Sequence, residues 1–586
     1  GTRTQDAIEG EGIKGAVLRG CEGDTANDYL EVVDGSTVLD ENEAATNTTN
    51  VLHCYRAVKT WQGPMFNLTE YLDEGCTYTL EADVFSLTAD LWASYQLQTT
   101  EDTAVGYGQL TGDSQSNPRI AAGEWKHVSY TVSIPDDKYY YALYFESYNG
   151  QKLDDIYLDN IKLTKTKANN RDTSIASLKE TYQDVFDIVG VGAGTDSLFG
   201  ESASEFIASQ YNAYTPGNEM KPDAILSSSM TALTLEEAKE KGYYIPDDYA
   251  SYSENRNKAG QGDVVVPELN FANIDQILQV CHEKGLKLRG HTLCWHEQTP
   301  AFFFTQNFRV AIGSKDKTTG DYKYQASKEV MDSRQEFFVK TVLNYVLKKD
   351  LELAGGDKSK CVVYGYDAVN EYLHSSTADS NTKPTYWGTI YDTTVDNGYM
   401  AKTGVTYYPS YVKDTFKWAH EVLVENDRTD VKLFYNDYNC YQYPEDIVHL
   451  VDYINSDGKI CDGIGMQAHL DISQSFHSAD NFAKALACFQ ENAPEVEVQI
   501  TELDATMEST ADNVKTDEDQ AAYYDQIMGT ILQNKKNGGN ITGVTIWSLY
   551  DGVSWRSAKY PCIFSGLYAP KSAFYAVIGA KATYWD

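Results

Sequence analysis

The stretch VVYGYDAVNE, residues 362–371, decides the fold of the larger part of this chain. It begins as an apolar, β-branched run, which is typical of a buried parallel strand, and it ends on Asn370 and Glu371. The stretch VEVQITELD, residues 496–504, repeats this pattern and places Glu502 near its end. Polar groups at the ends of buried strands are expected where parallel strands direct their carboxyl ends towards one common site.

Eight runs of this kind can be counted between residues 175 and 586. They are VGVGA from Val189, YNAYTP from Tyr211, LKLRGHTLCW from Leu286, VVYGYDAVNE from Val362, VKLFYND from Val431, DGIGMQAHL from Asp462, VEVQITELD from Val496 and GVTIWSLYD from Gly543. Amphipathic segments such as FANIDQILQVCHEKG separate them, so the sequence predicts an α/β fold, a (β/α)8 barrel with insertions. A doubly wound open sheet is the alternative, but VGVGAGTDSLFG matches its phosphate loop only loosely.

The first part of the chain has a different pattern. Short alternating stretches such as CTYTLEADVFSL from Cys76 and KHVSYTVSI from Lys126 are separated by turn signals. They predict an all-β jelly-roll sandwich over residues 1–165. The polar, turn-prone stretch TKTKANNRDTS follows, so we place a linker at residues 166–174 and the barrel at residues 175–586.

The composition excludes several classes of function. With 48 Lys and Arg against 86 Asp and Glu, the formal net charge is -38, which would repel the phosphates of nucleic acids. Aromatic residues make up 12% of the chain, and together with the carboxylates they suit a neutral, hydroxylated ligand. No run of 18 apolar residues predicts a membrane span, and the polar start GTRTQDAIEGEG is not a signal peptide. The ten cysteines are scattered without the spacing of a zinc site, so we expect structural thiols.

Polar, ionisable or aromatic residues follow nearly every predicted strand, and in a barrel they would converge on one rim. They are Asn218, Glu219, Lys221, His291, Trp295, His296, Asn370, Glu371, Asn436, Asp437, Asn439, Gln467, His469, Glu502, Asp504 and Trp547. Each one alone is more often a surface carboxylate, a core histidine or a packing residue. Together they favour a site, because glycoside hydrolysis needs one protonated and one ionised carboxyl group, and Glu371 and Glu502 would lie across the barrel mouth.

Seven segments resemble the family 10 glycoside hydrolases, in the same order and over about 410 residues. They are YTPGNEMKPD from Tyr214, LRGHTLCWHEQTP from Leu288, YDAVNE from Tyr366, YNDYN from Tyr435, GMQAHL from Gly465, ITELD from Ile500 and WSLYDGVSWR from Trp547. The resemblance implies an endo-β-1,4-xylanase that cuts xylan and xylo-oligosaccharides internally with retention, without a cofactor or a metal in the catalytic site. It assigns acid/base catalysis to Glu371 and nucleophilic attack to Glu502, with the two carboxyl groups about 5–5.5 Å apart.

The resemblance also implies supporting roles for other residues. Asn370 would hold the nucleophile and the 2-hydroxyl group of the sugar, and His469 would orient Glu502 with Asp504 behind it. The expected hydrogen-bonding partners of xylose on the non-reducing side are Asn218, Lys221, His291 and Gln467, and the expected walls of the subsites are Trp295, Trp547 and Trp555.

Three positions depart from the family pattern. Relatives usually carry an acidic residue at Gly217, where it binds the second sugar on the non-reducing side, so the strength of that subsite is in doubt. Tyr366 stands where a tryptophan is common, a change that we expect the barrel wall to tolerate. The segment from Ala224 to Pro267 is longer than usual, and its Gly, Asp and Tyr content suggests a surface loop near the cleft.

The segment from Arg56 to Val84 resembles family 22 carbohydrate-binding modules, and the related families four and nine remain alternatives. The candidate ligand contacts are Arg56, Trp61, Tyr107 and Glu146, although Trp61 and Glu146 could also be a core aromatic residue and an edge charge. Asp159, near the last strand, could help to bind a structural Ca²⁺, which prefers oxygen ligands.

Two other functions remain open for the barrel. It could be a catalytically silent glycan-binding domain, although both glutamates stand in intact motifs. It could also cleave cellulose or mixed-linkage β-glucan, which room for a C6 hydroxymethyl group would decide. Because a polymer such as xylan is too large to enter a cell, we expect a secreted or cell-surface protein.

Overall fold

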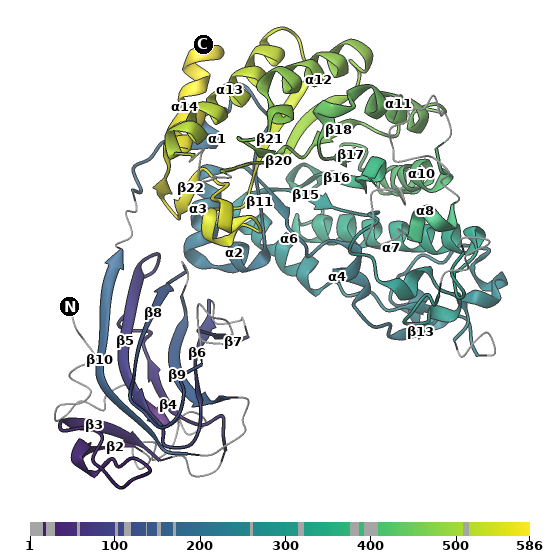
Figure 1. The fold of residues 1–586 in the computed structure, drawn as a ribbon. Helices are drawn as coiled ribbons and strands as arrows, with labels where there is room; N and C mark the ends of the chain where they lie inside the picture. The colour runs from purple at the N-terminus through teal and green to yellow at the C-terminus, as the bar shows by residue number, and fades with distance from the viewer. Residues whose placement is uncertain are drawn as a thin grey trace. The chain divides into compact units, whose positions relative to one another are not determined.

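The computed structural model divides the chain into two compact units, the first over Gly1–Arg171 and Phe199–Ala203 and the second over Asp172–Leu198 and Ser204–Asp586 (Figure 1). The residues that the structure describes are 16–18, 30–55, 59–99, 104–110, 119–135, 138–148, 154–167, 172–257, 262–314, 321–374, 386–391, 408–507 and 515–586.

The described part of the first unit contains two five-stranded antiparallel sheets. In spatial order, one sheet consists of β1 (Ala16–Leu18), β4 (Pro64–Asn67), β9 (Tyr140–Ser147), β6 (Leu91–Gln98) and β7 (Gly106–Gln109). The other consists of β2 (Leu30–Asp34), β3 (Asn50–Cys54), β10 (Ile156–Lys167), β5 (Thr77–Phe85) and β8 (Lys126–Ser133). The expected all-β sandwich is confirmed.

Strand β5 shows how the sequence produces this sandwich. Tyr78, Leu80, Ala82 and Val84 alternate with more exposed residues and are buried in the core between the sheets. Successive side chains of a strand point to opposite faces, so this alternation gives the strand one apolar face. Phe145 of β9 belongs to the same core.

Eight parallel strands close into a ring in the second unit, because β18 pairs with both β17 and β20. In chain order they are β11 (Ile188–Ala193), β12 (Ala213–Pro216), β15 (Lys287–His291), β16 (Val363–Asn370), β17 (Lys432–Asp437), β18 (Gly463–Met466), β20 (Glu497–Thr506) and β21 (Ile541–Trp547). All eight strands expected from the sequence are present, and the (β/α)8 barrel is confirmed.

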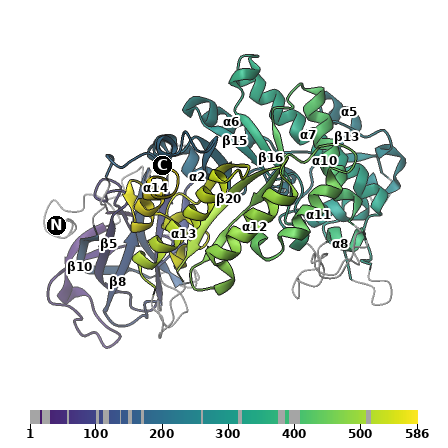
Figure 2. The ribbon, with the colours of Figure 1, turned by 90° about the horizontal axis from the view of Figure 1, so that it is seen from above.

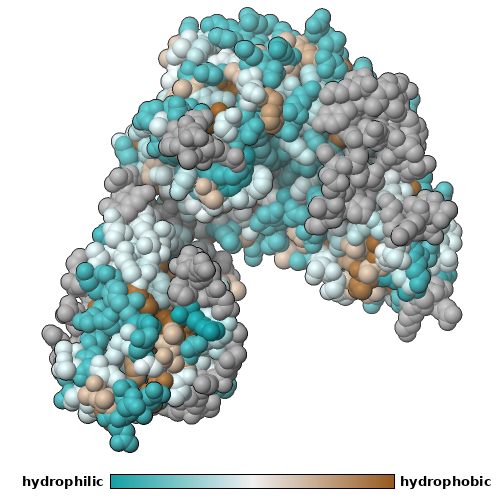
Figure 3. Space-filling model, in the orientation of Figure 1, coloured by the Kyte–Doolittle hydropathy of each residue, from teal (hydrophilic) through white to brown (hydrophobic). Residues whose placement is uncertain are grey.

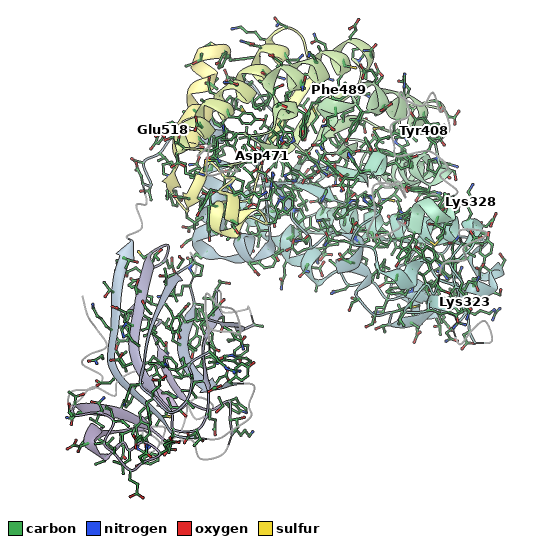
Figure 4. All side chains as sticks on the ribbon, viewed as in Figure 1. Lys323, Lys328, Tyr408, Asp471, Phe489 and Glu518 are labelled. Carbon is green, nitrogen blue, oxygen red and sulfur yellow. The ribbon has the colours of Figure 1, made fainter. Side chains whose placement is uncertain are left out.

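Helices surround the ring of strands (Figure 2). The longer ones are α3 (Glu201–Gln210), α6 (Ala272–Lys284), α7 (Lys328–Leu353), α10 (Ser410–Glu425), α11 (Pro444–Ile454), α12 (Ala479–Asn492), α13 (Asp517–Lys536) and α14 (Ser572–Tyr584). Shorter elements are α1 (Leu178–Thr181), α2 (Thr195–Phe199), α4 (Pro222–Leu226), α5 (Leu235–Glu240), α8 (Tyr386–Ile390), β13 (Ala232–Thr234), β14 (Val265–Pro267), β19 (His469–Asp471), β22 (Phe564–Gly566) and β23 (Ala569–Pro570). Lys328, which begins α7, and Asp471, which ends β19, are labelled in Figure 4.

Two glycines make room for large rings at the barrel mouth. A Cβ atom on Gly192 would lie 2.1 Å from the ring of Trp547, and one on Gly290 would lie 2.2 Å from the ring of Tyr366. Tyr366 is fully buried, so it fills the wall position where a tryptophan was the common residue. These glycines are needed because any side chain would displace an aromatic residue.

The segment from Ala224 to Pro267 is not the open loop near the cleft that its composition suggested. It contains α5 and the antiparallel pair β13 and β14, and the ring of its Tyr249 lies 5.9 Å from Phe337 of α7. Arg334 of α7 is buried and donates from Nε to Asn255 of the segment at 2.8 Å. None of its described residues lines the cleft, so the segment covers the outer helix layer.

Hydrophilic residues are spread over the coloured part of the barrel unit's face in Figure 3, with only small hydrophobic patches between them. Among the helices that the structure describes, none combines the length and the apolar character that crossing a membrane requires. The cysteines of the second unit, which are Cys281, Cys294, Cys361, Cys440, Cys461, Cys488 and Cys562, are free thiols.

Candidate active site

The carboxyl ends of the barrel strands surround a cleft of about 520 Å³. Every residue that was given a role in the barrel site lines it, except Asp504, which lies behind His469. Of the other residues expected at the rim, Glu219, His296, Asn436, Asp437 and Asn439 are not among the lining residues. The lining residues are Gly192, Ala193, Gly194, Gly217, Asn218, Lys221, His291, Trp295, Gln298, Asn370, Glu371, Tyr438, Gln467, His469, Glu502, Trp547, Ser548, Val553 and Trp555.

Glu371 directly follows β16, and its carboxyl group accepts two hydrogen bonds. Trp295 donates from Nε1 to Oε2 at 2.8 Å, and Gln467 donates from Nε2 to Oε1 at 2.7 Å. Burial raises the pKa of Glu371, and the negative charge of Asp437 raises it further, against the effect of the two donors. A raised pKa keeps a proton on the carboxyl group, which suits a general acid.

Glu502 lies inside β20 and is only 5% exposed. Asn436 donates from Nδ2 to its Oε1 at 2.9 Å, and Nε2 of His469 lies 3.0 Å from its Oε2. Burial alone would raise the pKa of Glu502, but the hydrogen bond and positive charge of His469 outweigh it and lower the pKa below its usual value. The two carboxyl groups of the cleft therefore favour opposite protonation states.

A chain of amides connects the two carboxyl groups. Asn436 also donates to Oδ1 of Asn370 at 2.9 Å, and Gln467, which contacts Glu371, donates to the same oxygen at 3.2 Å. The hydroxyl group of Thr501 donates to Oδ1 of Asn436 at 2.6 Å. Because the ionised carboxylate of Glu502 only accepts, the NH₂ group of Asn436 must face Glu502, and this fixes the direction of the chain.

His469 is held between Glu502 and a second carboxylate. Its Nδ1 lies 3.1 Å from Oδ1 of Asp504, an ion-pair distance without hydrogen-bond alignment. Burial would lower the pKa of His469, but the charges of Asp504 and Glu502 raise it well above its usual value. Arg556 donates to the same oxygen of Asp504 at 2.8 Å and to the carbonyl oxygen of Leu470 at 3.1 Å.

Lys221 and Asn218 lie at one end of the cleft. The amine of Lys221 donates to Oδ1 of Asn218 and to Oε1 of Gln298, both at 2.9 Å, and lies 4.7 Å from the centre of the Trp295 ring. Burial lowers the pKa of Lys221, although the charges of Glu502 and Glu371 oppose this. Such an amine offers charge-assisted hydrogen bonds to hydroxyl groups.

Charged side chains inside the barrel orient His291. Its Nδ1 lies 2.8 Å from Oδ2 of Asp367, which Arg289 also contacts. Because a carboxylate only accepts, Nδ1 carries a proton, and Nε2 is left for the cleft. His291 and His469 both pack edge-on against Trp547, at centroid distances of 6.2 and 6.0 Å.

The two tryptophans after β21 differ in exposure. Trp547 is 8% exposed and forms part of the cleft wall, whereas Trp555 is 69% exposed and packs edge-on against His469 at 5.4 Å. Large exposed aromatic side chains in a polar cleft are suited to the apolar faces of sugar rings.

Comparison with known proteins agrees with this geometry. The profile of glycosyl hydrolase family 10 matches residues 177–580. This chain is a family 10 glycosyl hydrolase. Over 406 residues it is 35% identical to endo-1,4-beta-xylanase A of Butyrivibrio fibrisolvens, and the match covers 69% of this chain and 84% of that enzyme.

Two further relatives of this family 10 hydrolase extend over its N-terminal unit. Endo-1,4-beta-xylanase A of Thermotoga maritima is 27% identical over 562 residues, which are 92% of this chain but only 44% of that enzyme. A Clostridium thermocellum endo-1,4-beta-D-xylanase with CBM22-1 and GH10 modules, solved with xylohexaose, is 21% identical with a TM-score of 0.52. The match covers 99% of this chain and 96% of the Clostridium thermocellum chain, so the two share the fold of a family 22 module followed by the barrel.

Gln298 and Tyr438 are among the residues that line the family 10 cleft and were not chosen from the sequence. Gln298 contacts Lys221, and it belongs to the segment LRGHTLCWHEQTP, in which only the residues before it were chosen. Tyr438 stacks on His374 at a centroid distance of 3.6 Å. It belongs to the segment YNDYN, in which only Asn436, Asp437 and Asn439 were chosen.

Gly217 lines the cleft and has room for a side chain. A Cβ atom there would meet only ordinary contacts, the nearest being the backbone of Ala193 at 3.6 Å. We therefore expect Gly217→Glu to lower KM for xylo-oligosaccharides by about tenfold, through one charge-assisted hydrogen bond worth about 1.5 kcal/mol, without changing kcat. Initial-rate kinetics test this, with Gly217→Ala as the control that adds only the Cβ atom. An unchanged KM in Gly217→Glu would show that the missing acid does not limit this subsite.

The candidate ligand contacts of the first unit are only partly brought together. Tyr107 of β7 is 64% exposed and pairs with Gln96, and Glu146 of β9 pairs with Trp92, so both lie on the outer face of one sheet. Trp61 lies just before β4 and is 39% exposed, which does not fit a core aromatic residue. Arg56 lies outside the described residues.

The surroundings of Asp159 do not favour a calcium site. Its Oδ2 accepts from Asn47 at 3.0 Å and from the hydroxyl group of Thr49 at 2.8 Å, and its Oδ1 accepts from the amide of Asn160. These donors satisfy the carboxylate without a cation, and the described residues include no group of three or more His, Cys, Asp or Glu that could hold a metal. Calcium binding stays a prediction, which an unchanged melting temperature in EDTA would contradict.

Proposed function

We propose that this chain is a retaining endo-1,4-β-xylanase that hydrolyses internal β-1,4 bonds of xylan through a covalent glycosyl-enzyme. The observation that carries the proposal is the pair of carboxyl groups in one cleft with pKa values displaced in opposite directions. Glycoside hydrolysis needs these two states, a protonated acid beside an ionised carboxylate, and retention is the outcome that is general to the family.

In the first step, Glu502 attacks the anomeric carbon while Glu371 protonates the oxygen of the leaving sugar. The hydrogen bonds from Asn436 and His469 direct both oxygens of Glu502 and keep the carboxylate ionised. In the second step, Glu371 has lost its proton and accepts one from water, which then attacks the glycosyl-enzyme. Asn370, held by Asn436 and Gln467, is placed to bind the 2-hydroxyl group of the sugar, a contact that strengthens in the transition state.

Xylan is the substrate that the site and the relatives favour together. Curated relatives that match the barrel are named endo-1,4-beta-xylanases, and we expect the bulky rings of Trp547 and Trp555, which line the cleft, to exclude a C6 hydroxymethyl group. The amine of Lys221 and the imidazole of His291 supply polar contacts for ring hydroxyl groups. Cellulose and mixed-linkage β-glucan, which carry C6 groups, are therefore disfavoured.

The deciding assay measures reducing-sugar release from xylan and from carboxymethyl cellulose by the same enzyme preparation. We expect hydrolysis of xylan with little release from carboxymethyl cellulose. Equal rates on both polymers would refute the xylanase assignment, and no release from either would favour a silent glycan-binding barrel. Proton NMR of the first product detects whether the β-anomer forms initially, which the retaining mechanism requires.

We also propose that the first unit binds xylan through the outer face that carries Tyr107 and Glu146. The exposed ring of Tyr107 can stack on a sugar, and Glu146 can accept its hydroxyl hydrogens. In affinity electrophoresis of the full chain in xylan gels, Tyr107→Ala and Trp61→Ala should each weaken retardation about tenfold or more. Tyr139→Ala, which removes another exposed tyrosine outside the strands, is the matched control. Retardation equal to wild type in both variants would move the binding site elsewhere.

An extracellular location completes the proposal, because a polymeric substrate must be cut before it can enter a cell. Xylanase activity in the culture medium of the source organism, compared with that in washed and lysed cells, tests this. Activity confined to the lysate would contradict it.

A further inference from the structure

The turn that carries Glu371 has an unusual backbone conformation. Glu371 has a φ of 57°, in the left-handed region that a residue with a Cβ atom adopts only when its surroundings hold it there. Its amide donates to the carbonyl oxygen of Asn436 at 2.8 Å, and its own carbonyl oxygen accepts from the amide of His374 at 3.1 Å. The position of the acid/base carboxyl group thus depends on what fixes this short turn.

His374 closes the turn and is buried, with 8% of its surface exposed. Its Nδ1 lies 2.7 Å from Oδ1 of Asp437, and since a carboxylate only accepts, this nitrogen carries a proton. Its Nε2 lies 2.6 Å from the hydroxyl group of Tyr443, and its ring stacks on Tyr438. The imidazole is therefore fixed on both nitrogens and on one face.

Hydrogen bonds fix the side chain of Asp437, and its backbone is linked through Gln467 to Glu371. The carboxylate accepts from the hydroxyl group of Tyr435 and from the amide of Tyr438 at 2.8 Å, and it is fully buried. Its carbonyl oxygen accepts from the amide of Gln467 at 2.9 Å, and the side chain of Gln467 donates to Oε1 of Glu371 at 2.7 Å. These contacts connect the turn, through two neighbouring strands, to the acid/base carboxyl group that the turn itself carries.

We propose that His374 is a positioning residue, which holds the acid/base carboxyl group of Glu371 in place through its hydrogen bond to Asp437. The inference rests on the proposed function, because it assigns His374 to the protonation step of that reaction. His374 does not line the cleft, so it acts through the turn and not on the sugar. The competing interpretation is that the imidazole only supports the ring of Tyr438.

The test uses two aryl β-xylobiosides that differ in their need for an acid. A phenyl leaving group needs protonation by Glu371, whereas a 2,4-dinitrophenyl group leaves without it. We expect His374→Ala to lower kcat/KM for the phenyl substrate by about 10- to 100-fold, as a misplaced catalytic group does, and to leave kcat/KM for the dinitrophenyl substrate within about twofold. His374→Asn keeps a donor near the position of Nδ1 and should restore most of the loss.

Two controls separate positioning from general damage. His282→Ala removes another imidazole that contacts a buried carboxylate, Asp350, at 2.9 Å, but outside the site, and should not distinguish the two substrates. Melting temperatures of all variants report folding. If His374→Ala does not fold, His374→Gln, which shifts the donor away from the Nδ1 position, takes its place in the comparison with His374→Asn.

Three results would overturn the inference: equal losses on both substrates, no loss on either, or an asparagine variant as impaired as the alanine variant. Equal losses would favour the supporting role beneath Tyr438. A wild-type enzyme that hydrolyses neither xylobioside would refute the proposed function instead, so the two failures are distinguishable.

Discussion

Replacing Glu502 with alanine is expected to lower kcat on xylan by about 10⁵-fold or more, the scale on which hydrolases lose activity without their nucleophile. The reason is that no other described carboxylate in the cleft is held ionised by two donors as Glu502 is by Asn436 and His469. Reducing-sugar release at matched protein concentration measures the loss. Glu497→Ala removes a carboxylate from the first residue of the same strand, away from the cleft lining, and should leave kcat unchanged.

Azide identifies the role of Glu502 as well as its importance. In Glu502→Ala, azide can take the place of the nucleophile and should yield the α-xylosyl azide from a 2,4-dinitrophenyl xylobioside. The β-configured azide from this variant would contradict the assignment, because it would mean that a nucleophile still forms the covalent intermediate.

The second large effect is expected for Glu371→Ala, which should lower kcat/KM on xylan by about 10²- to 10⁴-fold. A general acid must be protonated, so wild-type kcat/KM should fall as the pH rises through the pKa of Glu371, which burial and Asp437 raise above its usual value. The variant should lose this basic limb of the pH profile. On the dinitrophenyl substrate, azide should accelerate turnover and give the β-xylosyl azide.

Glu371→Gln is the matched variant, since it keeps the shape of the side chain and one of the two hydrogen bonds accepted from Trp295 and Gln467 but cannot transfer a proton. It should be as impaired as the alanine variant on xylan. A glutamine variant with near wild-type activity, or a basic limb that persists in both variants, would assign the acid to another group.

The sequence predicted the barrel well because its strands are buried on both faces and read as continuous apolar runs. Glu371 ends such a run and Glu502 interrupts one. A charged side chain does not improve packing at these positions, so both residues could be chosen as candidate catalytic residues. The direction of each pKa could not be predicted. It depends on His469 beside Glu502 and on Asp437 near Glu371, and these neighbours come from other strands.

One local feature could have been recognised from the sequence. The sequence TLEE at residues 234–237 forms a capping box, in which Thr234 and Glu237 satisfy each other's backbone amides at the start of α5, so the insertion was not a plain loop. Its docking on Arg334 of α7 was beyond prediction, because the partners are the carbonyl oxygen of Glu254 and the side chain of Asn255, groups without a sequence signature. The role of Tyr438 was hidden for a similar reason, since its contact with His374 joins different strands.

The contacts of the Arg556 guanidinium group relate the length of the substrate to the rate of turnover. Arg556 directly follows the exposed Trp555 and donates to Asp504. Asp504 lies at ion-pair distance from His469, which contacts Glu502. On the proposed function, we expect a xylan chain that stacks on Trp555 to influence the contacts that orient Glu502, because Trp555 also packs edge-on against His469. Binding energy gained far from the cleaved bond can then appear as faster turnover and not only as tighter binding, so short oligosaccharides would be poor substrates even at saturation.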